Sequence, residues 1–462
     1  MSAEYDYQNQ VLKVEPKGIE PIGPHERHGK PFTIFTLWFG ANVEFATLVT
    51  GALATGVFGL GFWSAAIAIL IGNLLGALAL GALSTFGPRL GVPQLIQSRK
   101  AFGYYGNFLP GILNFFAGFS WFAVNTVLGV FALQWLFKMS FGLGLAIMLV
   151  VQVIIAVYGY NLIHTLERWL AVVLTVVFVI VSIYAFAHGH LGAGTNLKIA
   201  AEVGGSTGAF MLTLAIAFSY CLGWMAFASD YSRYLPQKTS SRSVFLNAFW
   251  SLLISTVWLE VLGAGLATLK GISVPTDLVT NLLPQWLGVV TMIAVVLGTI
   301  TANVLNIYSG ALSSLVIDIP MKRWLGAIVV GVLGAIVAWF GGQNGYWAHY
   351  QSFLFLLGYW VAPWLAIVLV DFLFKARGRY ETGEFYDKSH AFGVGIWAFL
   401  IGIIVSVPFM NQYPLYVGWF PTNYPQFGDI TYFVGFIVAG LVYFLFARPR
   451  SLDAAGSRSE SA

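Results

Sequence analysis

The stretch AAIAILIGNLLGALALGAL, residues 65–83, contains no charged side chain over a length that can cross a lipid bilayer. About 20 consecutive apolar residues span the hydrocarbon core as an α-helix. Residues 141–158 and 170–187 have the same character, and neither segment contains a charge. These stretches predict membrane-spanning helices, and their repetition predicts an integral membrane protein.

The composition agrees with this interpretation. The chain has 462 residues, of which 58% are hydrophobic and 9% charged, whereas a soluble domain carries about 25% charged residues. The single cysteine, Cys221, excludes an intramolecular disulfide. The basic residues lie between apolar segments rather than in one patch, so we expect no nucleic-acid partner. No metal-ligand cluster, P-loop or nucleophile motif is present, so we expect neither a cofactor nor an enzyme.

The apolar segments predict an all-α polytopic membrane protein with about twelve transmembrane helices. The start of the chain does not fit a cleavable signal peptide. We expect cytoplasmic tails at residues 1–32 and 448–462, a transport core at 33–374 and two accessory spans within 392–447. The predicted spans are residues 33–58, 62–86, 107–136, 141–160, 168–187, 208–229, 244–269, 286–314, 324–341, 351–374, 392–409 and 430–447.

The orientation follows from the 23 lysines and arginines, which concentrate in cytoplasmic loops. With the N-terminus in the cytoplasm, only Lys138, Lys198 and Lys270 fall on the outer side. The opposite orientation would invert this bias. We therefore expect a multi-pass protein of the cell membrane with both termini in the cytoplasm. The sequence leaves the oligomeric state open.

Polar residues at depth in the first span mark a candidate site, because a polar group facing lipid is costly without a partner or a wet cavity. Asn42 and Glu44 lie there beside the small residues Gly40 and Ala41. A glycine at this position permits a helix break that exposes backbone groups. The alternative is close helix packing at Gly40 and an interhelical hydrogen bond from Glu44.

The third and sixth spans each carry a tryptophan at depth. Trp121 and Asn125 are four residues apart and share a helix face. In the sixth span, Gly223 beside Trp224 predicts a second break with a second aromatic plane. The alternative is that the indoles only pack inside the bundle, with Asn125 joining helices.

The eighth span places Thr299, Asn303 and Asn306 on one helical stripe, which must face the interior of the bundle. The alternative is that this polar stripe only joins helices through hydrogen bonds. Glu260 in the seventh span is another acid at depth, with no partner evident. At the end of the sixth span, we expect Asp230 and Arg233 to form an interfacial cap or ion pair.

This combination favours a flat, uncharged solute. Stacking on an aromatic side chain contributes roughly 1–3 kcal/mol per base, and an asparagine amide matches the donor and acceptor edge of a nucleobase. No lysine or arginine lies at depth to hold an anionic substrate. Uphill transport needs an ion, and one charge moving down about 100 mV supplies roughly 2.3 kcal/mol. Glu44 is a candidate proton carrier, whereas Thr301 with first-span carbonyls is a candidate Na⁺ site.

From about residue 18 to residue 375, the chain resembles the purine–cytosine permease family, also called nucleobase–cation symport family one, and is most similar to its cytosine/purine branch. Singly the shared motifs are weak, but together and in order they are specific. They are GIE (18–20), WFGAN (38–42), FGLGF (58–62), STFGP (84–88), SRKAFGYYG (98–106), WFAVN (121–125), WMAFASDY (224–231) and NIYS (306–309).

The resemblance implies a LeuT-type inverted repeat of five plus five helices, roughly 33–187 and 208–374, followed by two C-terminal helices. It places the substrate between Trp121 and Trp224, with Asn125 and Asn306 as polar contacts. Gly40 occupies a position where related permeases often have serine. Together with Asn42, Gly223 and Asn303, these residues form the predicted substrate site.

Sodium-coupled relatives carry paired Ser/Thr in the eighth span. Thr301 matches one member of that pair, but Ile300 replaces the other. Protons are therefore favoured over Na⁺ as the coupling ion. The predicted function is nucleobase import by symport with alternating access. Allantoin, hydantoin, a vitamin-like heterocycle or a nucleoside remain alternative substrates, and a passive channel or facilitator remains an alternative mechanism.

Overall fold

The computed structural model of the chain describes residues 10–343, 346–377, 379–412 and 415–449. Within these residues, nine helices are long and apolar enough to cross a membrane on their own. A tenth span is the pair α1 (Pro31–Asn42) and α2 (Phe45–Gly56), which meet at an angle of 58°. The shorter apolar helices Val394–Phe409 and Thr431–Phe446 correspond to the last two predicted spans. A polytopic helical membrane fold is confirmed.

The region predicted as the first repeat continues after α2 with seven helices, three of which (α4, α5 and α6) are only four or five residues long. These are α3 (Phe62–Ser84), α4 (Phe86–Leu90), α5 (Gln94–Gln97), α6 (Arg99–Phe102), α7 (Phe108–Phe137), α8 (Phe141–Tyr158) and α9 (Tyr160–His188). Helix α9 begins eight residues before the predicted span at 168. Gly159, at φ +85°, turns the chain directly from α8 into α9, so Glu167 lies inside the helix rather than in a loop.

The short helix α10 (Leu197–Ala201) precedes the region predicted as the second repeat, which also opens on an interrupted helix. The elements of this region are α11 (Gly205–Leu222), the 3₁₀ turn η1 (Met225–Phe227), α12 (Ala228–Ser232), α13 (Ser241–Ala267), the π-helical turn η2 (Leu278–Leu282), α14 (Gln285–Val316), α15 (Arg323–Gln343) and α16 (Tyr346–Val370). The division into inverted repeats stays a prediction.

The last part of the chain packs on the side of α16. It contains η3 (Asp371–Lys375), η4 (Thr382–Tyr386), α17 (Val394–Ser406), η5 (Val407–Phe409), β1 (Asn411–Gln412), β2 (Tyr416–Val417), α18 (Trp419–Asn423), η6 (Pro425–Phe427) and α19 (Thr431–Phe446). Strands β1 and β2 pair antiparallel, with Asn411 opposite Val417. This short ribbon is the one departure from an all-α chain among the described residues.

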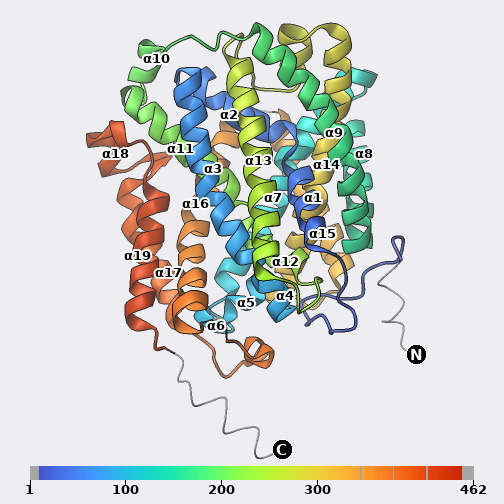
Figure 1. The fold of residues 1–462 in the computed structure, drawn as a ribbon, viewed down its shortest axis with the longest axis vertical. Coiled ribbons are helices and arrows are strands. Elements are labelled where there is room, and N and C mark those ends of the chain that lie inside the picture. The colour runs from blue at the N-terminus through green and yellow to red at the C-terminus, as the bar shows by residue number, and fades with distance from the viewer. Residues whose placement is uncertain (1–9, 344–345, 378, 413–414, 450–462) are drawn as a thin grey trace, which may run out of the picture.

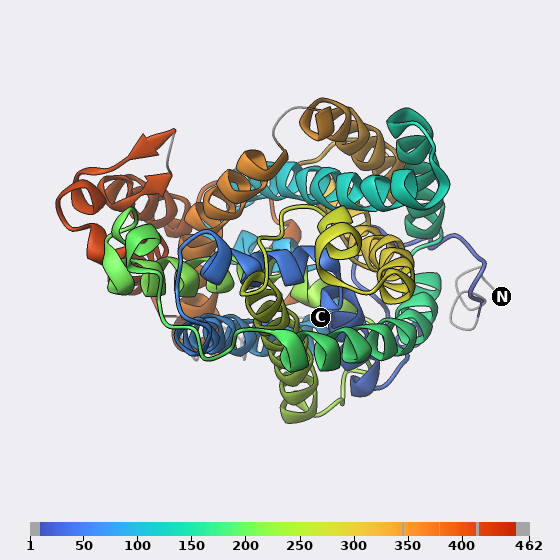
Figure 2. The same cartoon turned by 90° about the horizontal axis from the view of Figure 1, so that it is seen from above.

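Helices α1 and α2 run through the middle of the bundle, whereas α17 and α19 lie at its edge (Figures 1 and 2). Helix α1 packs against α9, α13 and α14, and α2 packs against α13 and α11. Small residues permit this close approach: a Cβ added at Gly51 or Gly263 would collide with backbone atoms of the facing helix. Asn42 and Glu44 at the first break are buried, as is Trp224 at the interruption of the sixth span.

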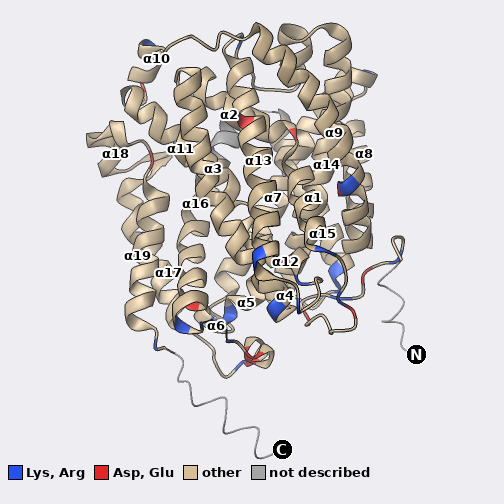
Figure 3. Cartoon of the chain, viewed as in Figure 1, with Lys and Arg blue, Asp and Glu red and all other residues tan. Residues whose placement is uncertain are grey.

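Charged residues gather at the end of the bundle that carries residues 10–30 and the close of α19 (Figure 3). We call this the terminal end. Few charged positions lie in the middle of the bundle, as expected where lipid surrounds it. The orientation of the terminal end relative to the cytoplasm stays a prediction.

A buried charge network ties the terminal end together. Glu15, 3% exposed, forms ion pairs with Arg233 at 3.6 Å and Arg323 at 3.7 Å. It also accepts hydrogen bonds from the hydroxyl groups of Tyr308, at 2.9 Å, and Tyr234. One carboxylate therefore connects the segment before α1 to α14, α15 and the residues after α12.

The predicted partnership of Asp230 with Arg233 is not formed between side chains. The Arg233 Nε donates to the backbone carbonyl of Asp230 at 3.2 Å, and its guanidinium pairs with Glu15 instead. Asp230 accepts from the backbone N–H of Gln94 at 2.9 Å. The pairing differs from the prediction because an N-terminal carboxylate, distant in sequence, reaches Arg233.

Candidate substrate and ion site

The first span breaks at Val43 and Glu44, between α1 and α2. Glu44 has an extended backbone, with φ −141° and ψ 171°. The Thr47 hydroxyl donates to the carbonyl of Asn42 at 2.7 Å, which satisfies one acceptor left by the break. The predicted interruption near Gly40 is therefore present, three residues further along the chain.

The sixth span is interrupted at Gly223 and Trp224, where α11 gives way to a 3₁₀ turn. The Trp224 Nε1 donates to Asn42 Oδ1 at 2.9 Å, so the two breaks are hydrogen-bonded to each other. Asn42 Nδ2 in turn donates to the Trp38 carbonyl at 2.7 Å. Both ends of the Asn42 amide are thus engaged in holding Trp224 in place.

Trp121 approaches the second break from α7. A Cβ on Gly223 would lie 3.1 Å from Trp121 Nε1, so the absence of a side chain at Gly223 leaves room for the edge of the indole ring. The Trp121 ring also meets Tyr220 edge-on, with centroids 5.7 Å apart, and Phe353 at 5.1 Å. Trp224 contacts Trp38 and Phe227. Each predicted indole is buried against its own neighbours rather than against the other indole.

The asparagine stripe of α14 lies against α7. Asn303 Nδ2 is within hydrogen-bond distance of the Phe122 carbonyl, the Thr126 hydroxyl and Gln152 Oε1, at 3.1, 2.9 and 3.0 Å. Asn303 Oδ1 accepts from Asn306 Nδ2 at 3.3 Å. Asn303 therefore connects α14 to α7 and α8, which is the helix-joining alternative for this residue.

Among the predicted site residues, two amide oxygens have no hydrogen-bond partner in the described parts of the chain: Asn125 Oδ1 and Asn306 Oδ1. Both residues are 1% exposed. A buried polar atom without a partner costs roughly 1–3 kcal/mol, and such an atom calls for a ligand, water or ion. These two acceptors, one on α7 and one on α14, are the features of the site that fit a hydrogen-bonding guest.

The predicted ion-coupling residues meet where α1, α2 and α14 converge. The Thr301 hydroxyl donates to its own helix at the Gly298 carbonyl, at 2.7 Å, and lies 3.3 Å from the carbonyl of Gly40. Glu44 accepts from the Tyr220 hydroxyl at 3.3 Å. Its Cβ faces Gly298, where an added Cβ would lie 3.1 Å away. Glu44 and Thr301 therefore flank the same point of α14.

Glu260 has a partner that the sequence did not indicate. Asn73 Nδ2 on α3 donates to its carboxylate at 2.7 Å, and the Cys221 thiol contacts Asn73 Oδ1 at 3.1 Å. The cluster joins α3, α11 and α13. It lies outside the set of predicted site residues and has a structural explanation.

Three residues that contact the predicted site were not predicted from the sequence: Tyr220, Gln152 and Glu167. Tyr220 and Gln152 lie inside correctly predicted spans, and their polar side chains were the available signal. Glu167 was assigned to a loop because the predicted fifth span began one residue too late to include it.

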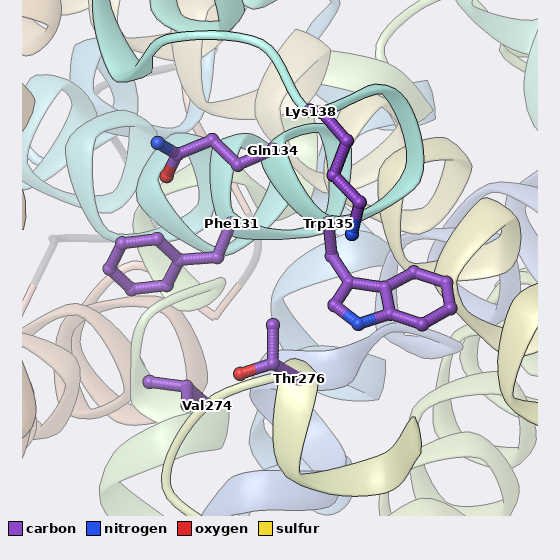
Figure 4. A pocket seen from close by; sticks show the side chains of 6 residues that line it. All are labelled: Phe131, Gln134, Trp135, Lys138, Val274 and Thr276. Carbon is purple, nitrogen blue, oxygen red and sulfur yellow. The ribbon is translucent and has the colours of Figure 1, made fainter. Parts of the chain in front are cut away.

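A cavity of about 440 Å³ lies near the C-terminal end of α7 (Figure 4). Phe131, Gln134, Trp135 and Lys138 of α7 line it, facing Val274 and Thr276. Trp121 lies fourteen residues before Trp135, or about 21 Å along the helix. This cavity is therefore separate from the predicted site.

Residues 21–435 match the family model described as permeases for cytosine/purines, uracil, thiamine and allantoin. The putative purine-cytosine permease YxlA of Bacillus subtilis is 31% identical over 96% of this chain and 98% of its own. The purine-cytosine permease fcyB of Emericella nidulans is 28% identical over 94% of this chain and 88% of its own.

The solved structure of Mhp1, a nucleobase-cation-symport-1 family transporter in a closed conformation with bromovinylhydantoin bound, is similar in fold. Its TM-score is 0.74, with 18% identity, over 94% of this chain and 95% of that one. A sodium-coupled sialic acid symporter matches with a TM-score of 0.65 and 11% identity, over 97% and 96% of the two chains. The chain is thus a multi-pass membrane transporter, not an enzyme, and it belongs to the family of permeases for cytosine/purines, uracil, thiamine and allantoin.

Proposed function

We propose that the protein is a secondary active symporter that imports a planar, uncharged nucleobase such as cytosine or a purine. It would act in the cell membrane by alternating access, with both termini in the cytoplasm. Membership of the permease family supports a small heterocyclic substrate. The names of the relatives YxlA and fcyB favour a purine or cytosine.

The observation that carries the proposal is the pair of buried, unpartnered acceptors, Asn125 Oδ1 and Asn306 Oδ1. Asn125 shares a helix face with Trp121, so one wall of the site offers both an aromatic surface and an acceptor. The ring N–H and exocyclic amino groups of a nucleobase are matching donors. A base sliding between Trp121 and Trp224 would also gain stacking energy.

Charge supports a neutral guest. None of the ion pairs among the described residues involves a predicted substrate-binding residue. The basic side chains Arg233 and Arg323 are already paired with Glu15 at the terminal end. An anionic substrate would enter the site without a counter-charge, which is costly in a low-dielectric interior.

The coupling ion in this proposal is a proton, with Na⁺ as the alternative. Glu44 supports protons, because it is a buried carboxyl at the helix break whose partner is a hydroxyl rather than a base. Thr301 supports Na⁺, because its hydroxyl and the Gly40 carbonyl lie side by side. Hard oxygen ligands of that kind suit such a cation.

Uptake in cells that lack their own nucleobase transporters tests the proposal. Labelled cytosine, adenine and hypoxanthine should accumulate above the external concentration, and a protonophore should abolish that accumulation while replacement of Na⁺ should not. Allantoin, a hydantoin, a pyridine-type vitamin and a nucleoside belong in the same competition series. Uptake that equilibrates without accumulating would indicate a passive facilitator.

Two substitutions test the site. Trp121→Ala and Asn306→Ala should each lower affinity at least tenfold in a binding measurement on purified protein. The control is Asn114→Ala, since Asn114 lies on the same α7–α14 interface but its amide already bonds Ser313 Oγ at 2.8 Å. The assignment is wrong if both site variants bind as tightly as the wild type.

A further inference from the structure

Glu167 on α9 is a buried carboxyl that no part of the predicted site uses. Its side chain is 0% exposed, and neither carboxyl oxygen has a hydrogen-bond partner in the described parts of the chain. None of the ion pairs among those residues includes it either. A charged carboxylate cannot stay in such a place without a partner, so the group must carry a proton or meet a cation.

Glu167 points at the first helix break. A Cβ added to Gly40 would collide with Glu167 Oε2, so the absence of a side chain at Gly40 is what admits this carboxyl. The carbonyl of the same Gly40 lies 3.3 Å from the Thr301 hydroxyl. Helices α1, α9 and α14 therefore meet at one point, with a carboxyl on one side and two oxygen groups on the other.

The groups that face Glu167 from neighbouring elements are acidic or neutral. Glu44, at the break, interacts with it electrostatically, and the Tyr231 hydroxyl of α12 is also within electrostatic range. His164, one turn earlier on α9, is buried and packs on the Tyr160 ring at 4.2 Å. Arg168, the next residue along, is exposed. Two carboxyls thus share a region without a basic partner.

We propose that Glu167 is a proton-exchanging group of the transport cycle, which forms a pair with Glu44 across the first helix break. This inference rests on the proposed symport function and assigns its coupling site. One proton adds to one carboxylate to give a neutral acid, and release reverses the step. The protonated pair is compatible with the close packing of α1 against α9 in this structure. When both carboxyls are ionised, their negative charges repel each other and favour separation of the two helices.

The test uses purified protein reconstituted in liposomes, with labelled cytosine, adenine or hypoxanthine. A one-unit inward pH gradient supports roughly tenfold accumulation for one proton per substrate. Wild-type protein should approach that ratio. In Glu167→Gln, which mimics the protonated acid permanently, accumulation should fall to a ratio of about one, while exchange of internal for external substrate stays within about threefold of wild type.

The matched control is Glu260→Gln. Glu260 is equally buried in a neighbouring helix, but one of its carboxyl oxygens accepts a hydrogen bond from Asn73, whereas neither oxygen of Glu167 has a partner among the described residues. It should keep gradient-driven accumulation. If Glu167→Gln also keeps it, or if a Na⁺ gradient alone drives both proteins equally, the inference is overturned. Lost exchange in Glu167→Gln, with normal folding, would likewise overturn it, since it would make Glu167 part of the binding site.

An infrared titration separates this inference from the proposed substrate. Protonated carboxyls absorb in a band distinct from carboxylates, and the band can be followed against pH without any substrate. The wild type should show a component that disappears as the pH rises and that is missing in Glu167→Gln. Absence of nucleobase exchange together with that component would refute the substrate but retain Glu167 as a proton site. No difference between the two spectra would refute the proton site.

Discussion

Buried carboxyl groups have many polar partners at the terminal end of the bundle but few at its centre. At the terminal end, Glu15 is surrounded by two arginines and two tyrosine hydroxyl groups. At the centre, Glu167 has no hydrogen-bond partner among the described residues, and Glu44 has the hydroxyl of Tyr220. The ion pairs and hydrogen bonds of Glu15 hold neighbouring helices together. An unpaired carboxyl is free to change its charge, which suits a group that exchanges ions.

The same contrast divides the asparagines of α14. The Asn303 amide is hydrogen-bonded to α7 and α8 through its nitrogen and to Asn306 through its oxygen. Asn306 Oδ1, in contrast, has no hydrogen-bond partner among the described residues. Two residues of the same type, three positions apart, therefore have different roles. The distinction depends on which helices pack on each side of the stripe.

Removing Glu15 should have the largest effect on stability. Glu15→Ala leaves Arg233 and Arg323 buried without their shared counter-charge, and breaking a buried pair in this way costs about 3–5 kcal/mol. Denaturant unfolding of the purified protein in detergent measures the change. Glu20→Ala is the control, because Glu20 is exposed in the same segment and should shift stability by less than about 0.5 kcal/mol. Equal effects would show that the network does not hold this end together.

Removing Asn303 should have an intermediate effect. Asn303→Ala leaves Gln152 and Thr126 without a bond to α14, and interhelical hydrogen bonds of this type contribute about 1–2 kcal/mol. The same unfolding measurement applies. Asn306→Ala serves as the comparison: its stability should change less, while its nucleobase affinity falls more. If the two variants lose stability and affinity in the same proportion, the division of roles within the stripe is wrong.

Neutralising Glu167 should have the smallest effect on stability. Glu167→Gln keeps the shape of the side chain and breaks no hydrogen bond or ion pair found among the described residues, so the change should stay below about 1 kcal/mol. The unfolding free energy is compared with that of wild type at a pH near neutrality. A loss as large as that of Glu15→Ala would mean that Glu167 is a structural, paired carboxylate, and the contrast between the two regions would disappear.

Much of the fold followed from local properties of the chain. Residues 65–83 are apolar over a length that can cross a membrane, and they lie inside α3 and its continuation, Phe62–Leu90, close to the predicted span 62–86. The breaks at Glu44 and Gly223 were indicated by glycines and polar residues within otherwise apolar segments. The fifth span was predicted to begin at residue 168, whereas α9 begins at Tyr160, buries Glu167 and exposes Arg168.

The site was predictable as a set of residues but not as a set of contacts. Trp121, Trp224 and the asparagines were recognisable because polar and aromatic groups at depth need a protein environment. The bond from Trp224 to Asn42, the pairing of Glu260 with Asn73 and the bare carboxyl at Gly40 join residues far apart in the chain. Periodicity describes one helix at a time, so it carries no information about such pairs.

By itself, the sequence determined that this chain crosses the membrane repeatedly and where its apolar segments are interrupted. Both follow from the free energy of moving side chains and backbone groups from water into lipid, which is determined for each segment separately. Only the tertiary structure decided which polar groups are satisfied. Glu15 and Asn303 have partners on other helices, whereas Asn125, Asn306 and Glu167 have oxygens without a partner among the described residues. The difference arises because satisfaction of a buried group depends on what packs against it.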